Sequence, residues 1–389
     1  MSRTYYIRNL VNSTHVLKDC AMEVDGDKIV SIRPVKTCGE EWHEYAVPGF
    51  IDIHTHGGAG FEFMDDSVDA MQTISRFYLK NGTTSFLVST VTDSLEKTES
   101  VITTAEKFMK NNQVGSSYGN EATCLGVHLE GPWLSRNNAG AQNPEYCIPP
   151  DDRGLELIKR HLSSVKMVTF SYHTSQAGML LSLLADNGII PATGHDEAVD
   201  EQIAEGFRKG IKVVTHIYCA TSGFRRTGSV KHLGTLEMAL MTDGVSVEVI
   251  ADGKHITKYI WDFILHNKKK DDILIISDSM RCAGMPEDPY RTYKLGRMDV
   301  TVHDGVAWLK DSDMFAGSVA TMYSNFRRLV CEWGTDMSDA VAMTSRNQAR
   351  LLGFSDRGIL DAGAVADVVF LDQSMNIESV LKSGIMLKK

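Results

Sequence analysis

Residues 48–58 read Pro-Gly-Phe-Ile-Asp-Ile-His-Thr-His-Gly-Gly. The apolar-rich run at residues 50–53 predicts a short buried β-strand, and His54 and His56 follow it directly. Because residues i and i+2 of a strand point to the same face, both imidazoles can reach one bound ion. Polar side chains at the C-terminal end of a buried strand are typical of barrel enzymes. This stretch therefore predicts a barrel strand and part of a metal site together.

Further apolar runs of strand length follow along the chain and alternate with helical patterns. This alternation is the order of βα units that build a parallel sheet. We therefore expect an α/β protein with a (β/α)₈ TIM-type barrel. The predicted strands cover residues 50–53, 85–89, 123–128, 166–171, 189–193, 212–215, 245–250 and 273–277, and the clearest helical patterns cover 68–80, 175–187, 199–209 and 258–266.

The two flanks of the chain differ from this pattern. Residues 1–47 are rich in Tyr, Ile, Val and Thr, and the tail carries a strand after a turn. Neither flank is long enough to bury its own core. We expect residues 1–47 and 355–389 to pair into one small β-sandwich domain beside a barrel of residues 48–354. Residues 293–311 also predict a β-hairpin that turns at Asp304-Gly305.

Composition excludes several classes of protein. The formal net charge of −10 disfavours a nucleic-acid partner, because phosphates repel an acidic surface. The apolar runs are too short to span a membrane, and the first residues lack a secretory signal, so we expect a cytoplasmic protein. The seven cysteines contain no Cys-x-x-Cys pair, which argues against a disulfide framework or a thiolate zinc site.

Histidines and carboxylates follow most of the predicted strands. A single histidine of this kind is more often a hydrogen-bonded structural residue than a ligand. A whole set at equivalent strand ends favours a site for a divalent ion such as Zn²⁺, which imidazole and carboxylate bind well. The set comprises His54, His56, Glu130, His195, His216, His255 and Asp278.

Several segments resemble the N-acetylglucosamine-6-phosphate deacetylases of the amidohydrolase superfamily. The most specific is His128-Leu-Glu-Gly-Pro-Trp133, because Glu130 stands where many relatives use a carboxylated lysine. The motifs occur in family order from residue 48 to 318, and the flanks match the family's small β-domain. The other matching segments are 48–58, Gly194-His195-Asp-Glu-Ala, Thr215-His216, Ala251-Asp-Gly-Lys-His255, Ser277-Asp278 and Ala316-Gly-Ser318.

The resemblance implies a metal-dependent deacetylase that binds one or two divalent ions, with Zn²⁺ first and Fe, Mn or Co also open. Asp278 would move a proton between a water molecule and the leaving amine, and His255 would polarise the acetyl carbonyl. The implied ligands are Glu130, His195 and His216 for the main ion, and His54 and His56, with Glu130 and Asp278 bridging, for a second one.

Departures from the family pattern cluster where the family recognises the sugar phosphate. From the third residue after His216 the deacetylases usually read Asn-Ala-Met, whereas this chain has Cys219-Ala-Thr. The family's phosphate-binding arginine, which reaches across a dimer interface, has no clean match, so Arg225 or Arg226 would replace it in a homodimer that shares residues 224–228. The implied substrate-binding residues are Gln142, Cys219, Ala220, Arg225, Arg226 and His255.

The leading hypothesis is therefore deacetylation of N-acetylglucosamine 6-phosphate. The alternative is the same chemistry on N-acetylgalactosamine 6-phosphate or on an unphosphorylated N-acyl compound. A cyclic amidase of the dihydroorotase type is less favoured because Glu130 replaces the modified lysine. A barrel that has lost catalysis and only binds a ligand is disfavoured because Asp278 and His255 are both retained.

Overall fold

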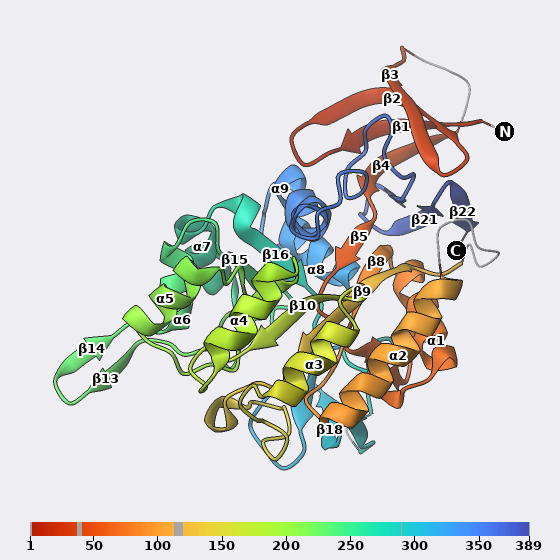
Figure 1. Cartoon of the computed structure of the whole chain (residues 1–389). Helices are drawn as coiled ribbons and strands as arrows, with labels where there is room; N and C mark the ends of the chain where they lie inside the picture. The colour runs from red at the N-terminus through yellow and green to blue at the C-terminus, as the bar shows by residue number, and fades with distance from the viewer. Residues whose placement is uncertain (1, 37–40, 113–119, 289, 389) are drawn as a thin grey trace.

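The computed structural model describes residues 2–36, 41–112, 120–288 and 290–388. Cys38, one of the seven cysteines, lies outside these ranges. A barrel forms the body of the molecule, a small sheet from both chain ends lies to one side of it, and a thin hairpin projects from the other side (Figure 1). No helix within the described ranges is both long enough and apolar enough to cross a membrane.

Eight strands of the described chain form the barrel, and each is parallel to its neighbour in chain order. All eight predicted strands are confirmed, with ends that shift by only a few residues. The backbone N–H of Asp278 donates to the carbonyl of His54 at 2.9 Å, which joins the ends of the last and first strands. The strands are β5 (Phe50–Asp52), β8 (Thr83–Ser89), β9 (Thr123–Glu130), β10 (Val165–Phe170), β11 (Ile190–Thr193), β12 (Val213–Val214), β15 (Ser246–Ile250) and β16 (Ile273–Ile276).

The helices that surround the barrel bury one apolar face each. The helix α1 (Val68–Lys80) begins at Ser67, whose side chain accepts the backbone N–H of Ala70, and it has the bounds that the sequence predicts. The other α-helices are α2 (Leu95–Asn111), α3 (Asp152–Arg160), α4 (Ala177–Asp186), α5 (Glu201–Lys209), α6 (Thr235–Met241), α7 (Lys258–Asn267), α8 (Met322–Arg327), α9 (Met337–Val341) and α10 (Asn347–Leu351). Short helical turns are η1 (Phe63–Asp65), η2 (Arg136–Asn138), η3 (Lys270–Asp272), η4 (Arg328–Glu332) and η5 (Ala342–Arg346).

The two flanks pair as predicted, and their described strands form one sheet in the order β22-β21-β20-β4-β1-β2-β3. The strand β4 joins them, because it pairs in parallel with β1 and antiparallel with β20. On the basis of this pairing we propose two domains. Residues 1–47 together with residues 355–389 form the small domain, and residues 48–354 form the barrel. The strands are β1 (Arg3–Val11), β2 (Val16–Asp25), β3 (Lys28–Pro34), β4 (Trp42–Pro48), β20 (Val368–Leu371), β21 (Ile377–Lys382) and β22 (Ile385–Lys388).

Two antiparallel segments, here called excursions, project from the barrel: β17–β19 and β13–β14. The predicted hairpin at 293–311 is present and gains a third strand, and both Asp304 and Gly305 have positive φ (55° and 72°), as its tight turn requires. A second hairpin projects between β12 and α6, and the sequence did not predict it. The strands are β17 (Tyr293–Leu295), β18 (Met298–His303) and β19 (Val306–Leu309) in the first, β13 (Arg225–Thr227) and β14 (Val230–His232) in the second, and β6 (Gly57–Gly58) with β7 (Phe61–Glu62) in a small ribbon after β5.

Candidate active site

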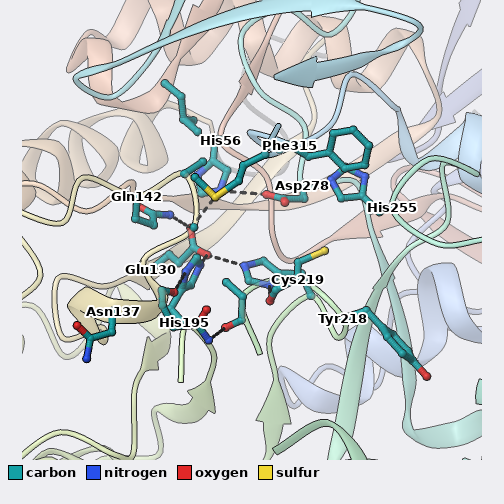
Figure 2. A pocket seen from close by; sticks show the side chains of 18 residues that line it. His56, Glu130, Asn137, Gln142, His195, Tyr218, Cys219, His255, Asp278 and Phe315 are labelled. Carbon is teal, nitrogen blue, oxygen red and sulfur yellow. Dashed lines mark hydrogen bonds and ion pairs between the residues drawn. The ribbon is translucent and has the colours of Figure 1, made fainter. Parts of the chain in front are cut away.

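A cavity of about 370 Å³ opens where the barrel strands end (Figure 2). Most of the polar residues predicted from the sequence line this cavity, and His54 is fully buried beside them. Leu295, Met314 and Phe315 add an apolar wall from the three-stranded excursion and the segment after it. The predicted residues that line the cavity are His56, Glu130, Gln142, His195, His216, Cys219, Ala220, His255 and Asp278.

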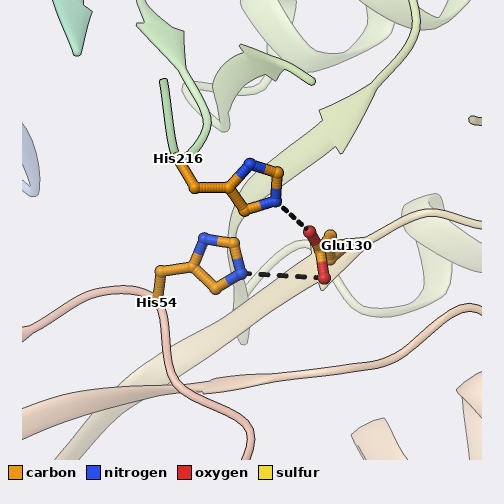
Figure 3. Close-up of side chains that lie close together, drawn as sticks. All are labelled: His54, Glu130 and His216. Carbon is orange, nitrogen blue, oxygen red and sulfur yellow. Dashed lines mark hydrogen bonds and ion pairs between the residues drawn. The ribbon is translucent and has the colours of Figure 1, made fainter. Parts of the chain in front are cut away.

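Glu130, at the end of β9, lies at the centre of the predicted ligands. Its Oε1 atom is 3.1 Å from His195 Nε2 and 2.9 Å from His216 Nε2. Its Oε2 atom is 3.3 Å from His56 Nε2 and 3.7 Å from His54 Nε2. Figure 3 shows His54 and His216 meeting this carboxylate from two sides. Three strand ends that are distant in sequence, those of β5, β11 and β12, therefore direct four imidazoles at one carboxylate.

Asp278 completes a second group on the far side of His56. Its Oδ1 atom is 3.2 Å from His56 Nε2 and 3.7 Å from His54 Nε2. Two sets of ligand atoms have all members within 4.8 Å of one another, namely His54 with Glu130 and His216, and His54 with His56 and Asp278. His54 belongs to both sets, so the arrangement offers two adjacent positions for an ion.

Each of these histidines has its Nδ1 atom opposite a hydrogen-bond acceptor. A carbonyl or carboxylate only accepts, so Nδ1 carries a hydrogen, Nε2 faces the cluster, and the neutral ring would offer its Nε2 lone pair there. This is the tautomer that a metal-ligating histidine needs. The pairs are His54 with Glu248 Oε2 at 2.8 Å, His56 with Ser89 O at 3.3 Å, His195 with Asn138 O at 3.2 Å, and His216 with Cys219 O at 3.1 Å.

The electrostatics of the cluster also favour a cation. Burial alone would lower the pKa of His56, but hydrogen bonds to Asp278 and Glu130 raise that pKa to about 9. The pKa of Glu130 lies well below its usual value, because the charge of His54 and several imidazole hydrogen bonds outweigh burial, which would raise it. The buried Nε2 of His54 has no hydrogen-bond partner in the described part of the chain. A divalent ion therefore fits these residues.

Three of the predicted residues adopt a backbone conformation that is rare outside glycine. His195, His216 and Asp278 have φ values of 47°, 27° and 47°, and each follows directly after, or two residues after, a barrel strand. Such conformations concentrate at functional sites because the surrounding structure must hold them. The backbone carbonyl of Asp278, for example, accepts the N–H of Ser318 at 2.8 Å. This local turn directs the side chains inward, toward the barrel axis.

His255 lies in the loop after β15 and lines the cavity beside Asp278 (Figure 2). Its Nδ1 atom is 2.8 Å from Asp252 Oδ2, and the other Asp252 oxygen accepts the backbone N–H groups of Lys254 and His255 at 2.8 and 2.9 Å. The ring of Phe315 lies 5.0 Å from the imidazole. The loop therefore holds the His255 ring in one orientation, with Nε2 as its free nitrogen.

Gln142 lines the cavity and also contacts Glu130, one of the predicted metal ligands. Its side-chain Nε2 donates to Glu130 Oε2 at 2.5 Å, and its Oε1 accepts the backbone N–H of Thr92 at 2.8 Å. Its assignment to substrate stays a prediction, while the observed contacts hold Glu130.

Arg225 and Arg226 lie apart from the cavity. Both are exposed on β13 of the projecting hairpin, where Arg226 donates to the carbonyl of Gly228. Among the residues that the structure describes, no lysine or arginine lines the cavity. Cys219 and Ala220 do line it, next to His216. The structure thus brings together every predicted site residue except these two arginines.

Sequence reasoning missed two carboxylates that orient imidazoles, Glu248 for His54 and Asp252 for His255. A signal for Glu248 was present, because it is a lone charged residue within the apolar strand Ser246–Ile250. Burial of a charge in such a strand is costly and marks a functional or paired group.

A βα-barrel with imidazole and carboxylate ligands at its strand ends defines a metal-dependent hydrolase. Residues 45–386 match the model of the amidohydrolase family, a metal-dependent family, and the chain belongs to it. Within that family the N-acetylglucosamine-6-phosphate deacetylase of Lysinibacillus sphaericus is 31% identical, over 88% of this chain and 85% of the relative. The N-acetylgalactosamine-6-phosphate deacetylase of Escherichia coli O157:H7 is 27% identical over 99% of both chains.

A solved structure supports the same family assignment. A mutant N-acetyl-D-glucosamine-6-phosphate deacetylase of Mycobacterium smegmatis, in complex with N-acetyl-D-glucosamine-6-phosphate, superposes with a TM-score of 0.89. It is 28% identical, and the match covers 100% of each chain. The similarity therefore includes the small sheet as well as the barrel.

Proposed function

We propose that this protein hydrolyses the N-acetyl group of an amino sugar phosphate, with N-acetylglucosamine 6-phosphate as the first candidate. The products are acetate and the amino sugar phosphate. The observation that carries the proposal is the convergence of imidazole Nε2 atoms on Glu130 and Asp278 in one cavity. The named activity of the 31% identical relative supports the choice of substrate.

The proposed ligands are those that the family resemblance implies. Glu130, His195 and His216 would hold one ion, and His54 and His56, together with Glu130 and Asp278, would hold a second. Zn²⁺ is the first candidate, with Fe, Mn or Co as alternatives, because nitrogen and oxygen ligands suit each of them. A divalent ion held there supplies Lewis acidity to the acyl carbonyl and lowers the pKa of a water molecule.

Asp278 is the proposed acid and base. Its carboxylate lies in the cavity and contacts His56 from one oxygen, Oδ1, so it is close to the reacting groups. The carboxylate takes the proton of the attacking water and then transfers it to the amine nitrogen, which must be protonated to leave. Burial would raise the pKa of Asp278, but the hydrogen bond from His56 and the nearby imidazole charges lower it, which keeps the carboxylate ionised.

His255 is the proposed group that stabilises the oxyanion. Asp252 accepts the hydrogen of Nδ1, so in the doubly protonated ring, where both nitrogens donate, Nε2 would donate to the acyl oxygen. Removal of one such donor costs about 3–4 kcal/mol of transition-state stabilisation in other enzymes. Leu295, Met314 and Phe315 exclude water from the same part of the cavity.

Phosphate recognition would require a second copy of the chain. The described cavity lining has no lysine or arginine, whereas Arg225 and Arg226 are exposed on a hairpin that projects from the barrel. A guanidinium binds phosphate through two parallel hydrogen bonds. We therefore propose a homodimer in which residues 224–228 lie at the shared face and one of these arginines reaches the other cavity. The cytoplasmic location expected from the sequence is part of this proposal.

A second candidate is hydrolysis of an unphosphorylated N-acyl compound. The same lack of a cationic side chain among the described lining residues favours it. N-Acetylgalactosamine 6-phosphate is a third, supported by the 27% identical relative with that named activity.

The test is acetate release from N-acetylglucosamine, N-acetylglucosamine 6-phosphate and N-acetylgalactosamine 6-phosphate, each with metal-loaded and chelator-treated protein. We expect turnover of the first phosphorylated compound to be fastest and to disappear after chelation. Turnover of unphosphorylated compounds alone would exclude the phosphate role of Arg225 and Arg226. Activity that survives complete removal of metal would exclude the metal-dependent mechanism.

A further inference from the structure

Glu248 is a fully buried carboxylate in the middle of β15, where its neighbours Val247 and Val249 are apolar. Its side-chain contacts with described residues reach two of the proposed metal ligands, here called the metal cluster: His54, His56, Glu130, His195, His216 and Asp278. Its Oε2 atom is 2.8 Å from His54 Nδ1 and accepts the backbone N–H of His216 at 3.3 Å. Its Oε1 atom has no hydrogen-bond partner within the described ranges. Because an isolated buried carboxylate is strongly disfavoured, its retention requires a function that uses the charge.

The partner of His54 differs in kind from those of the other predicted histidine ligands. His56, His195 and His216 each face a backbone carbonyl, whereas the described contacts of His54 Nδ1 lead to a charged side chain. His54 also belongs to both groups of potential ligand atoms. Of the two histidines proposed for the second ion, His54 is therefore the one whose orientation depends on a side-chain carboxylate that a substitution can remove.

Two tautomers of His54 compete, one with the hydrogen on Nδ1 and one with the hydrogen on Nε2. Glu130 and Asp278 place carboxylate oxygens 3.7 Å from Nε2, which is beyond hydrogen-bonding distance but close enough to attract a hydrogen on Nε2 electrostatically. In that tautomer the Nε2 lone pair is lost and His54 cannot bind an ion. Glu248, at a shorter 2.8 Å, holds the hydrogen on Nδ1 and increases the basicity of Nε2.

We propose that Glu248 is the positioning residue that makes His54 a metal ligand, and that binding of the second ion depends on it. The inference rests on the proposed metal-dependent function. Because one oxygen of Glu248 contacts both the His54 ring and the backbone N–H of His216, Glu248 also links the residue after β5 to the residue after β12. Loss of a comparable outer carboxylate weakens metal binding about 10–100-fold.

The test is Zn²⁺ titration of the metal-free full-length protein against a chromophoric chelator, with metal content measured by mass spectrometry. We compare wild type with Glu248→Gln, which keeps the shape and removes the charge. Glu121→Gln is the matched control, because Glu121 is a buried carboxylate that pairs with Arg76 away from the cavity. We expect two ions in wild type and in the control, and a second ion bound 10–100-fold more weakly in Glu248→Gln.

The outcomes separate the inference from the function on which it rests. Two equally tight ions in Glu248→Gln, or a single ion in wild type, would overturn the inference alone. A wild-type protein that binds no metal would overturn the proposed function as well. If Glu248→Gln weakens the binding of both ions equally and also lowers the melting temperature of the metal-free protein, Glu248 has a merely structural role. That result would also overturn the inference.

A double variant keeps the proposal testable if Glu248→Gln folds poorly. Because Glu248 acts through His54, its replacement should have no further effect on metal affinity in a His54→Gln background. Additive losses of affinity in the double variant would contradict the inference.

Discussion

The metal cluster and the β13–β14 hairpin would serve one reaction, but the cluster side chains are buried and hydrogen-bonded, whereas the hairpin is exposed to solvent. The cluster residues are between 0% and 7% exposed, and each histidine is fixed on its outer side by an acceptor. On the hairpin, Phe224 and Val230 are 61% and 60% exposed, and both arginines face solvent. Preorganised groups on barrel strands suit bond cleavage, whereas an exposed hairpin suits recognition that another surface must complete. The following predictions test that difference.

The largest effect is expected from Asp278→Asn in the cluster. The amide keeps an oxygen for the metal but cannot carry the proton, so kcat should fall by about 10²–10⁴-fold while the metal content stays unchanged. Steady-state kinetics with metal analysis on the same sample measures both. Asp262→Asn, an exposed carboxylate on α7 that pairs with Lys258, should keep full activity. An active Asp278→Asn protein would exclude the proposed acid and base.

The hairpin arginines should affect binding and leave the chemistry intact. A double replacement, Arg225→Ala with Arg226→Ala, removes charge-assisted hydrogen bonds to phosphate, so KM for the phosphorylated substrate should rise about 10–100-fold. The kcat for an unphosphorylated compound should not change. Lys231→Ala on the neighbouring strand is the control for loss of positive charge. An equal loss with both substrates would contradict the comparison between the two regions.

Metal affinity should depend on pH through the cluster. The pKa of His56 is raised to about 9 by hydrogen bonds to Asp278 and Glu130 that outweigh burial, so His56 is protonated at neutral pH before metal binds. An incoming ion must displace that proton, so affinity should rise about tenfold per pH unit for each proton released, and level off for His56 near pH 9. Calorimetric titration of metal-free protein in buffers of different ionisation enthalpy counts the protons. Affinity that is independent of pH from 6 to 9 would refute this.

The smallest effect is expected at the base of the hairpin. His232 Nδ1 lies 2.5 Å from Asp200 Oδ2, and this hydrogen bond is the first cause of the lowered pKa of Asp200. The side chains of His232 and Asp200 are 23% and 46% exposed, so loss of this pair should change the stability only slightly. His232→Ala should raise KM for the phosphorylated substrate less than the arginine replacements do, with an unchanged melting temperature. A large loss of stability would show that the hairpin is held as firmly as the cluster.

Most of the barrel could be predicted because its signals are local. The eight barrel strands are short, mostly apolar runs between helical patterns, and Ser67 caps the start of α1. The parallel pairing of β1 with β4 and the third strand beside the predicted hairpin were not predicted. Both depend on contacts between segments that do not specify each other locally.

The sequence by itself determined the barrel, the set of imidazoles and carboxylates, and their positions at strand ends. Strand periodicity and parallel order suffice for this, because they bring all the C-terminal ends to one rim. Only the tertiary structure decided that Glu248 orients His54 from 194 residues away, that Gln142 holds Glu130, and that Arg225 and Arg226 lie outside the cavity lining of their own chain. Such pairings depend on through-space distance and burial, which no local pattern of residues encodes.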